Sequence, residues 1–154
     1  MSSELKAWRV VLVPIELLRP HEETEREKVL ELVSLLKSSG EIRSTVLVDV
    51  KTLIVLDGHH RVEALRLLGC SLVPALLVDY DSDCVKISSW REGVAVTKND
   101  VRRAGLEGCL MPPKTSKHSL CFQPPSLSVS LETLKDPKRS YEVLLDLGSH
   151  LNLS

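Results

Sequence analysis

The chain has 154 residues, of which 43% are hydrophobic and 27% charged, and 20 Lys plus Arg nearly balance 21 Asp plus Glu to give a formal net charge of −1. This composition is typical of one globular domain, and the near-zero charge argues against binding to nucleic acid or to an anionic membrane through a strong overall field. Its apolar runs are far shorter than the roughly 20 residues that span a bilayer, and the opening MSSELKAWR lacks the apolar block of a secretory signal, so we expect a cytoplasmic protein.

A strand and a helix are the first elements predicted along the chain. Residues 9–15, RVVLVPI, are apolar and rich in β-branched side chains, which favours a short strand that its proline ends. Thr24 and Glu27 have the spacing of a capping box, apolar residues follow at helical spacing, and Gly40 stops the pattern. We therefore predict a helix over residues 24–38.

Two strands and a second helix are predicted next. The segments TVLVDV (45–50) and LIVLD (53–57) alternate with turn residues and predict two strands joined by a tight turn. Beyond Gly58, apolar residues recur at helical spacing until Gly69, which predicts a helix. The sequence DGHHR, residues 57–61, therefore places its two histidines and its arginine in the first helical turn.

The second half of the chain predicts strands over residues 73–80 and 84–90 and a short helix from Thr97 to Gly108. PKTSKH, residues 113–118, is predicted to be a loop whose hydroxyls and cationic donors bind an oxyanion. A final amphipathic helix is predicted to begin at Asp136-Pro137. Strands with interspersed helices predict a small α+β domain with a mixed sheet flanked by helices.

Four cysteines lie far apart and form no C-x-x-C pair: Cys70, Cys84, Cys109 and Cys121. This spacing argues against a zinc knuckle or a redox dithiol. We expect mostly reduced, structural thiols, with one disulfide if the protein comes from a hyperthermophile.

The DGHHR turn combines several groups that bind phosphate. The amides at a helix N-terminus favour an anion, Arg61 can grip two phosphoryl oxygens, and each imidazole can donate a hydrogen bond. Asp57 can hold Mg²⁺ or orient an imidazole. In the alternative reading, Asp57 is a helix cap and His59, His60 and Arg61 are an exposed first turn. Cations there oppose the helix dipole unless an anion is bound, which favours the phosphate site.

Four motifs in the same order resemble the ParB N-terminal-like/sulfiredoxin superfamily and, within it, the archaeal free serine kinases. They are D-G-H-H-R with the following x-x-A-L-x-x-L-G, R-P-H-E (residues 19–22), DCVKISSW (83–90) and PKTSKH (113–118). The resemblance covers roughly residues 9–135. Longer members of the family insert a segment between the tryptophan strand and the PKT loop, whereas about twenty residues join Trp90 to Pro113 here. Ser116 and Lys117 stand where the family motif P-K-T-T-R-H has Thr and Arg.

The resemblance implies transfer of a phosphoryl group from ATP or ADP, with Mg²⁺, to the hydroxyl of free L-serine, giving O-phosphoserine. It implies that Glu22 is the general base, that Asp57 serves the reacting centre or the metal, and that Trp90 walls the serine site together with Glu22 and His118. The residues implied to bind the nucleotide or the transferred phosphate are Gly58, His59, His60, Arg61, Lys114, Thr115, Ser116, Lys117 and His118.

In terms of domains, residues 1–135 are expected to form the catalytic domain, and residues 136–154 a helical extension that packs on it or on a partner subunit. The expected partners are L-serine and the nucleotide, with no nucleic acid and no membrane, in a monomer or a homodimer. Of the two nucleotides, ATP is slightly favoured as the donor.

Three other functions predict sequence features of their own. A sulfiredoxin-like reductase needs a cysteine in the core motif, where this chain has two histidines. A ParB-like nucleotide-binding module for DNA partitioning or regulation predicts a basic surface or a helix-turn-helix, and the near-neutral charge argues against it. A non-catalytic sensor of amino acid or nucleotide on the same scaffold stays open, although Glu22 beside a phosphate-binding turn favours turnover.

Overall fold

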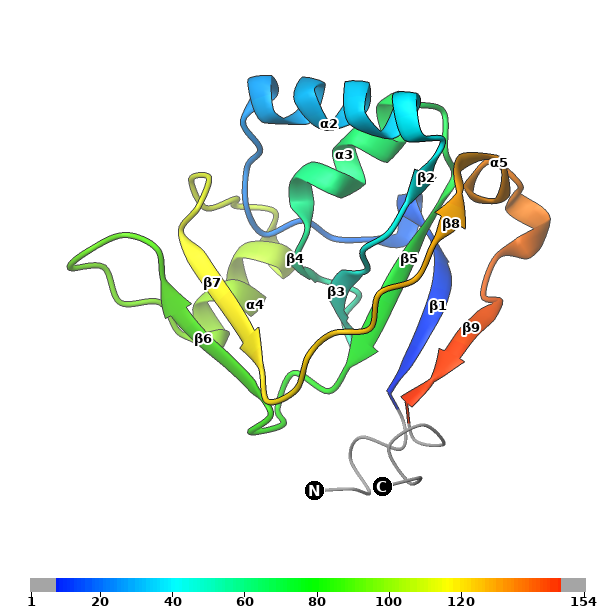
Figure 1. Ribbon diagram of the computed structural model, residues 1–154. Helices are drawn as coiled ribbons and strands as arrows, with labels where there is room; N and C mark the ends of the chain where they lie inside the picture. Colours follow the sequence, from blue (N-terminus) through cyan, green and yellow to red (C-terminus); the bar gives the residue numbers. More distant parts are fainter. Residues whose placement is uncertain (1–7, 148–154) are drawn as a thin grey trace.

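A computed structural model describes residues 8–147. Its centre is a five-stranded mixed sheet with the strand order β4-β3-β5-β1-β9 (Figure 1). The strands of this sheet are β1 (Arg9–Pro14), β3 (Val46–Asp49), β4 (Val55–Asp57), β5 (Leu72–Val78) and β9 (Val143–Asp146). Only the β3–β5 pair is parallel among the described strands.

Two smaller sheets and four α-helices complete the described part of the chain. The sheets pair β2 (Glu41–Ile42) with β8 (Val129–Ser130), and β6 (Val85–Ser89) with β7 (Ser116–Leu120). The α-helices are α2 (Arg26–Ser39), α3 (His59–Leu67), α4 (Lys98–Glu107) and α5 (Leu131–Leu134). Short 3-10 turns lie at Ile15–Leu17 and Pro137–Arg139.

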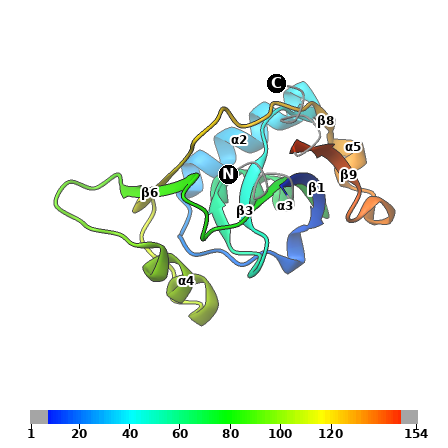
Figure 2. The ribbon, with the colours of Figure 1, turned by 90° about the horizontal axis from the view of Figure 1, so that it is seen from below.

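Both faces of the central sheet are buried, and successive residues of a strand enter different cores. Val11 packs with the apolar faces of α2, α3 and α5, whereas Val10 packs with β6, α4 and their neighbours. Figure 2 shows α2 and α4 on opposite sides of the sheet strands. This arrangement holds the β6–β7 ribbon and α4 against one face while α2 and α3 cover the other.

Most of the predicted elements are confirmed, including the 45–57 hairpin, the helix after Gly58 and the Thr97-capped helix α4, whose capping box with Asp100 forms. The helix predicted over residues 24–38 also forms, but the prediction that a capping box of Thr24 and Glu27 begins it was wrong. The N-cap residue is Glu25, one position later than expected, and its backbone amide donates to the imidazole of His60. An acceptor from a distant part of the chain, the His60 imidazole, thus replaces the side chain from the same turn that the capping box would have supplied.

The final amphipathic helix predicted from Asp136 was wrong. After the 3-10 turn, residues 143–146 form strand β9, which pairs antiparallel with β1. Tyr141 has a φ of 67° and donates its amide to the carbonyl of Leu12, so the chain turns onto the sheet at this point. The edge of β1 accepts this segment as the fifth strand of the sheet, whereas a short helix is marginal without tertiary packing. The expectation for residues 148–154 lies outside the described residues.

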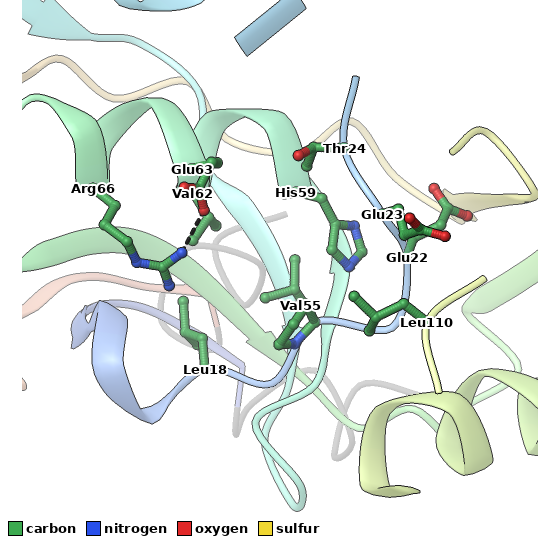
Figure 3. A pocket seen from close by; sticks show the side chains of 11 residues that line it. Leu18, Glu22, Glu23, Thr24, Val55, His59, Val62, Glu63, Arg66 and Leu110 are labelled. Atoms are coloured by element: carbon green, nitrogen blue, oxygen red, sulfur yellow. Dashed lines mark hydrogen bonds and ion pairs between the residues drawn. The ribbon is translucent and has the colours of Figure 1, made fainter. Parts of the chain in front are cut away.

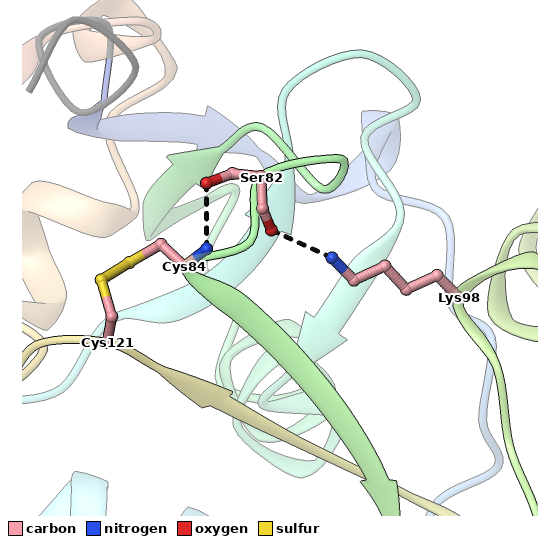
Figure 4. The surroundings of a disulfide bond; sticks show 4 residues. All are labelled: Ser82, Cys84, Lys98 and Cys121. Atoms are coloured by element: carbon pink, nitrogen blue, oxygen red, sulfur yellow. Dashed lines mark hydrogen bonds between the residues drawn. A yellow bond between two sulfur atoms is a disulfide. The ribbon is translucent and has the colours of Figure 1, made fainter. Parts of the chain in front are cut away.

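A disulfide joins Cys84 to Cys121, directly beyond the last paired residues of β6 and β7 (Figure 4). Next to it, the Cys84 amide donates to the Ser82 hydroxyl, and Lys98 donates to the Ser82 carbonyl. Among the described cysteines, Cys70 and Cys109 are unpaired. The expectation of mostly reduced thiols was therefore wrong for Cys84 and Cys121, which form the single disulfide that was expected only for a protein from a hyperthermophile.

Between residues 8 and 147, no helix combines the length and the apolar character that crossing a bilayer requires.

Candidate active site

A cavity of about 500 Å³ opens where the N-termini of α2 and α3 face the turn before β7. Its lining contains most of the residues that the sequence had pointed to, drawn from segments up to 94 positions apart. The lining residues are Glu22, Lys28, Leu32, Leu56, Asp57, Gly58, His59, His60, Arg61, Trp90, Lys114 and Ser116.

The turn into α3 depends on Gly58. Its φ of 108° lies in the left-handed region, and a Cβ built there would be 2.8 Å from the Val46 side chain and 3.1 Å from the Arg61 guanidinium. Arg61 is fixed beside it by a hydrogen bond of 2.9 Å to the carbonyl of Thr45 and by Asp57 at 3.6 Å. The absence of a side chain at position 58 therefore lets the turn into α3 pack tightly against Val46 and Arg61.

We predict that Gly58→Ala lowers the free energy of unfolding by about 1–3 kcal/mol and weakens nucleotide binding, because the methyl group strains the turn and displaces Arg61. Gly93→Ala is the matched control: Gly93 also has a positive φ, of 77°, but its Cβ would meet open space among the described residues. Urea unfolding and calorimetric titration with nucleotide measure both effects. Equal nucleotide affinity in the two variants would contradict the prediction.

The two histidines of this turn hold a neighbouring loop in place. Nε2 of His59 accepts the backbone amide of His21 at 3.1 Å, and Nε2 of His60 accepts that of Glu25 at 3.0 Å. Burial lowers the pKa of both imidazoles, in keeping with neutral acceptors. These nitrogens are therefore committed to the loop that carries Glu22, whereas the sequence had led us to expect them to donate to phosphate.

Glu22 is held on the opposite side by the start of β7. Its Oε1 accepts three hydrogen bonds: from the amides of Thr115 and Ser116 at 3.1 and 2.8 Å, and from the Ser116 hydroxyl at 2.9 Å. The side chain is 10% exposed, and Met111 pairs with the loop through the His21 carbonyl and the Glu23 amide. With Oε1 satisfied, Oε2 is the oxygen that this carboxylate offers to a ligand.

The PKTSKH segment is only partly a loop, because residues 116–120 form β7. Lys114, in a left-handed conformation with φ 56°, points into the cavity beside Lys28, and this second ammonium lowers the pKa of Lys114. Lys117 lies 4.5 Å over the Trp90 ring. His118 is not among the residues that line the main cavity, and its Nε2 lies 2.7 Å from the hydroxyl of Tyr80 in the core.

Buried histidines make stability depend on pH. Burial lowers the pKa of His118 to about 3, below the value of about 6.5 in an unfolded chain. Below about pH 6.5 this histidine binds a proton in the unfolded state but not in the folded state. The free energy of unfolding is therefore highest above about pH 6.5 and decreases as the pH falls toward 3. From about pH 7.5 to about pH 5, we expect such a histidine to lower the free energy of unfolding by about 2 kcal/mol. Urea unfolding at the two pH values measures it, and His118→Phe should lose less; equal losses would contradict the assignment.

A second cavity, of about 130 Å³, shares Glu22 and His59 with the first. Figure 3 shows Leu18, Val55 and Leu110 around its lower part, and Glu63 and Arg66 paired on one side. Its remaining lining includes Glu23 and Thr24. The loop that carries Glu22 is thus exposed to a cavity on each side.

Sequence reasoning missed three residues that line the main cavity: Lys28, Leu32 and Leu56. Lys28 and Leu32 lie one turn apart on α2, and this spacing could have identified them once the helix was known to face the site. Among residues 8–147, no group of three or more His, Cys, Asp or Glu side chains is arranged to hold a metal ion. Asp57, whose side chain is 65% exposed, and Glu22 are the two carboxylates among the lining residues of the main cavity.

Residues 1–89 match the family described as the ParB N-terminal domain. The chain is similar to a ParB-like protein of Sulfolobus acidocaldarius, with 35% identity over 78 residues that cover 51% of this chain and 39% of the relative. It is also similar to an ATP-dependent L-serine kinase of Staphylothermus marinus, with 29% identity over 104 residues that cover 62% of this chain and 41% of the relative. The chain spans less than half the length of these two relatives.

The fold is also similar to that of a free serine kinase solved in complex with AMP. The TM-score is 0.75 at 18% sequence identity, and the match covers 82% of this chain and 93% of the other. This likeness confirms the predicted fold, a mixed sheet flanked by helices.

Proposed function

The chain belongs to the ParB N-terminal domain family, and we propose that it is a kinase that transfers a phosphoryl group from a nucleotide to the hydroxyl of free L-serine. The observation that carries the proposal is the position of Glu22: a fixed carboxylate with one satisfied oxygen faces the same cavity as the N-terminus of α3 and two lysines. A base for the acceptor hydroxyl and a binding site for phosphate are thus combined in one cavity. The similarity to an L-serine kinase supports the choice of acceptor.

Phosphoryl transfer requires mainly positioning and charge neutralisation, and each part has a candidate. Glu22 accepts the proton of the serine hydroxyl through Oε2. Gly58 and the first amides of α3, with Arg61, hold the nucleotide phosphates. Lys28 and Lys114 neutralise charge from the side of α2 and β7. All these residues lie between positions 22 and 116, within the residues 1–135 that are proposed as the catalytic region, and strand β9 beyond them completes the same central sheet.

Asp57 fits a Mg²⁺ that is bound mainly through phosphate oxygens, because such a metal needs only one or two carboxylates from the protein. When bound, Mg²⁺ would supply positive charge to the phosphates. The exposed carboxylate of Asp57 at the edge of the cavity is the group that would hold it.

Trp90 and Lys117 are proposed to form the outer wall of the serine site. The Trp90 side chain is 60% exposed although it lines the cavity, and Lys117 covers its ring. A bound amino acid would bury this indole, which accounts for an exposed tryptophan at the end of a strand.

The experiment that tests the proposal incubates the purified protein with L-serine, Mg²⁺ and either ATP or ADP. We expect O-phosphoserine, with ADP or AMP as the second product, and the second product identifies the donor; the kinase relative favours ATP. Nucleotide binding without O-phosphoserine from either donor would refute the kinase and would instead indicate a nucleotide-binding regulatory or DNA-partitioning module.

A further inference from the structure

The turn formed by residues 112–116 supplies the amides that hold Glu22, and the Thr115 hydroxyl closes this turn. Thr115 Oγ1 donates to the carbonyl of Pro112 at 2.7 Å, and the residue is 7% exposed. Thr115 is not among the residues that line the main cavity, although the family resemblance implied that it binds the nucleotide or the transferred phosphate. The single hydrogen of this hydroxyl is used inside the turn, so none is left to donate to a phosphate.

The 112–116 turn contains a strained residue, and contacts with its surroundings keep it in shape. Lys114 has a φ of 56°, in the left-handed region, which is unfavourable for a residue other than glycine. The next two backbone amides both point at one oxygen, Glu22 Oε1, at 3.1 and 2.8 Å. Arg91 also fixes the turn, because it donates to the carbonyl of Pro113 at 2.9 Å. Strain of this kind persists only where the surroundings determine the conformation, and it is concentrated at functional sites.

We propose that Thr115 is a positioning residue whose hydroxyl keeps the 112–116 turn in the conformation that aims Glu22 at the acceptor hydroxyl; this inference rests on the proposed kinase function. A carboxylate rotates about its last side-chain bond, so Oε2 has a fixed direction only while Oε1 is held. Two amides of the turn hold Oε1, and the Thr115 side chain holds the peptide units that carry these amides. A displacement of about 1 Å near the reacting atoms can lower the rate about 10²-fold, so this indirect role has a measurable effect.

The first test removes the hydrogen bond of the Thr115 hydroxyl and keeps the shape of the side chain. Thr115→Val places a methyl group at a buried position that already holds a β-branched side chain. We expect kcat to fall about 10- to 10²-fold, with the KM for serine and the nucleotide affinity changed less than about twofold, because Thr115 lies outside the lining of the main cavity. Thr115→Ser, which keeps the hydroxyl, should restore most of kcat. Unchanged kcat in Thr115→Val would overturn the inference.

Thr52→Val is the matched control. Thr52 Oγ1 also donates to a residue three positions earlier, Asp49, at 2.6 Å, but it lies in the turn between β3 and β4, which does not line the main cavity. Each variant loses one hydrogen bond, so both should show a similar decrease in the midpoint of urea unfolding. Only Thr115→Val should lose kcat. A kcat that falls equally in the two variants would reflect stability alone and would contradict a positioning role.

A double variant tests whether Thr115 acts through Glu22. In Glu22→Gln the base is absent, so its direction no longer affects the rate, and adding Thr115→Val should lower the residual kcat by less than about twofold. If Thr115→Val instead lowers kcat by the same factor with and without Glu22, Thr115 does not act through this carboxylate.

The last test needs no turnover. Hydrogen exchange of the Ser116 amide should be at least about tenfold faster in Thr115→Val than in the wild type, because the turn that directs this amide at Glu22 opens more often. Thr52→Val should leave the exchange of this amide unchanged. Unaltered Ser116 exchange in Thr115→Val overturns the inference, whatever the activity. Absence of O-phosphoserine from the wild type, by contrast, would refute the proposed kinase function, so the two failures are distinguishable.

Discussion

Glu22→Gln should abolish most of the phosphoryl transfer while leaving the fold and nucleotide binding intact. The amide keeps an oxygen that can accept the hydrogen bonds from Thr115 and Ser116, so the loop stays in place. It cannot take up the proton of the acceptor hydroxyl, and general-base catalysis typically contributes about 10²–10⁴-fold to the rate. We therefore expect kcat to fall by about that factor, measured as O-phosphoserine formed under saturating substrates.

Glu23→Gln is the matched control for this variant. Glu23 is the adjacent carboxylate, is exposed, and lines the smaller cavity. Its kcat should stay within about twofold of the wild type. If both variants lost activity equally, or if Glu22→Gln stayed active, Glu22 would not be the base.

Replacement of His59 should have the largest effect on stability. In His59→Ala, the buried amide of His21 loses its acceptor and a cavity replaces the ring, which together cost about 2–5 kcal/mol of unfolding free energy. Because that amide belongs to the residue before Glu22, kcat should fall as well. Urea unfolding and steady-state kinetics measure the two losses.

His60→Ala provides the comparison, because His60 also accepts a loop amide but is less buried. Its expected loss is about 1 kcal/mol, the net value of one hydrogen bond. A larger loss of stability in His60→Ala than in His59→Ala would show that burial of the His59 contact does not set the effect.

The local elements of the fold could be predicted from sequence, because glycines and apolar spacing marked them. Gly58 and Gly69 bracket α3, and Thr97 caps α4 through its own neighbours. The errors arose where a distant partner decided the structure. Glu25 became the N-cap of α2 because His60 accepts its amide, and residues 143–146 became a strand because β1 had an open edge. Such partners lie outside any local sequence window.

Sequence identified the residues of the candidate site better than their contacts. Glu22, Asp57, Lys114 and Trp90 face one cavity as expected. The directions of individual atoms could not be read from the motifs, since they depend on which backbone groups come within reach. For this reason His59 and His60, which were expected to donate to phosphate, instead accept backbone amides from the loop that carries Glu22. For the same reason His118 lies within hydrogen-bonding distance of Tyr80 in the core.

The β6–β7 ribbon has a consequence for how proteins of this kind vary in length. At the site end of the ribbon, Ser89 and Ser116 are direct partners, and at the far end Cys84 and Cys121 are joined covalently. The connection between the two strands, residues 90–115, therefore begins and ends at adjacent points, and it carries α4, which packs on the central sheet. Each doubling of such a connection costs only about 0.6 kcal/mol in closure entropy. The fold therefore tolerates a longer connection there, while Trp90, Ser116 and the carboxylate that Ser116 holds keep their positions.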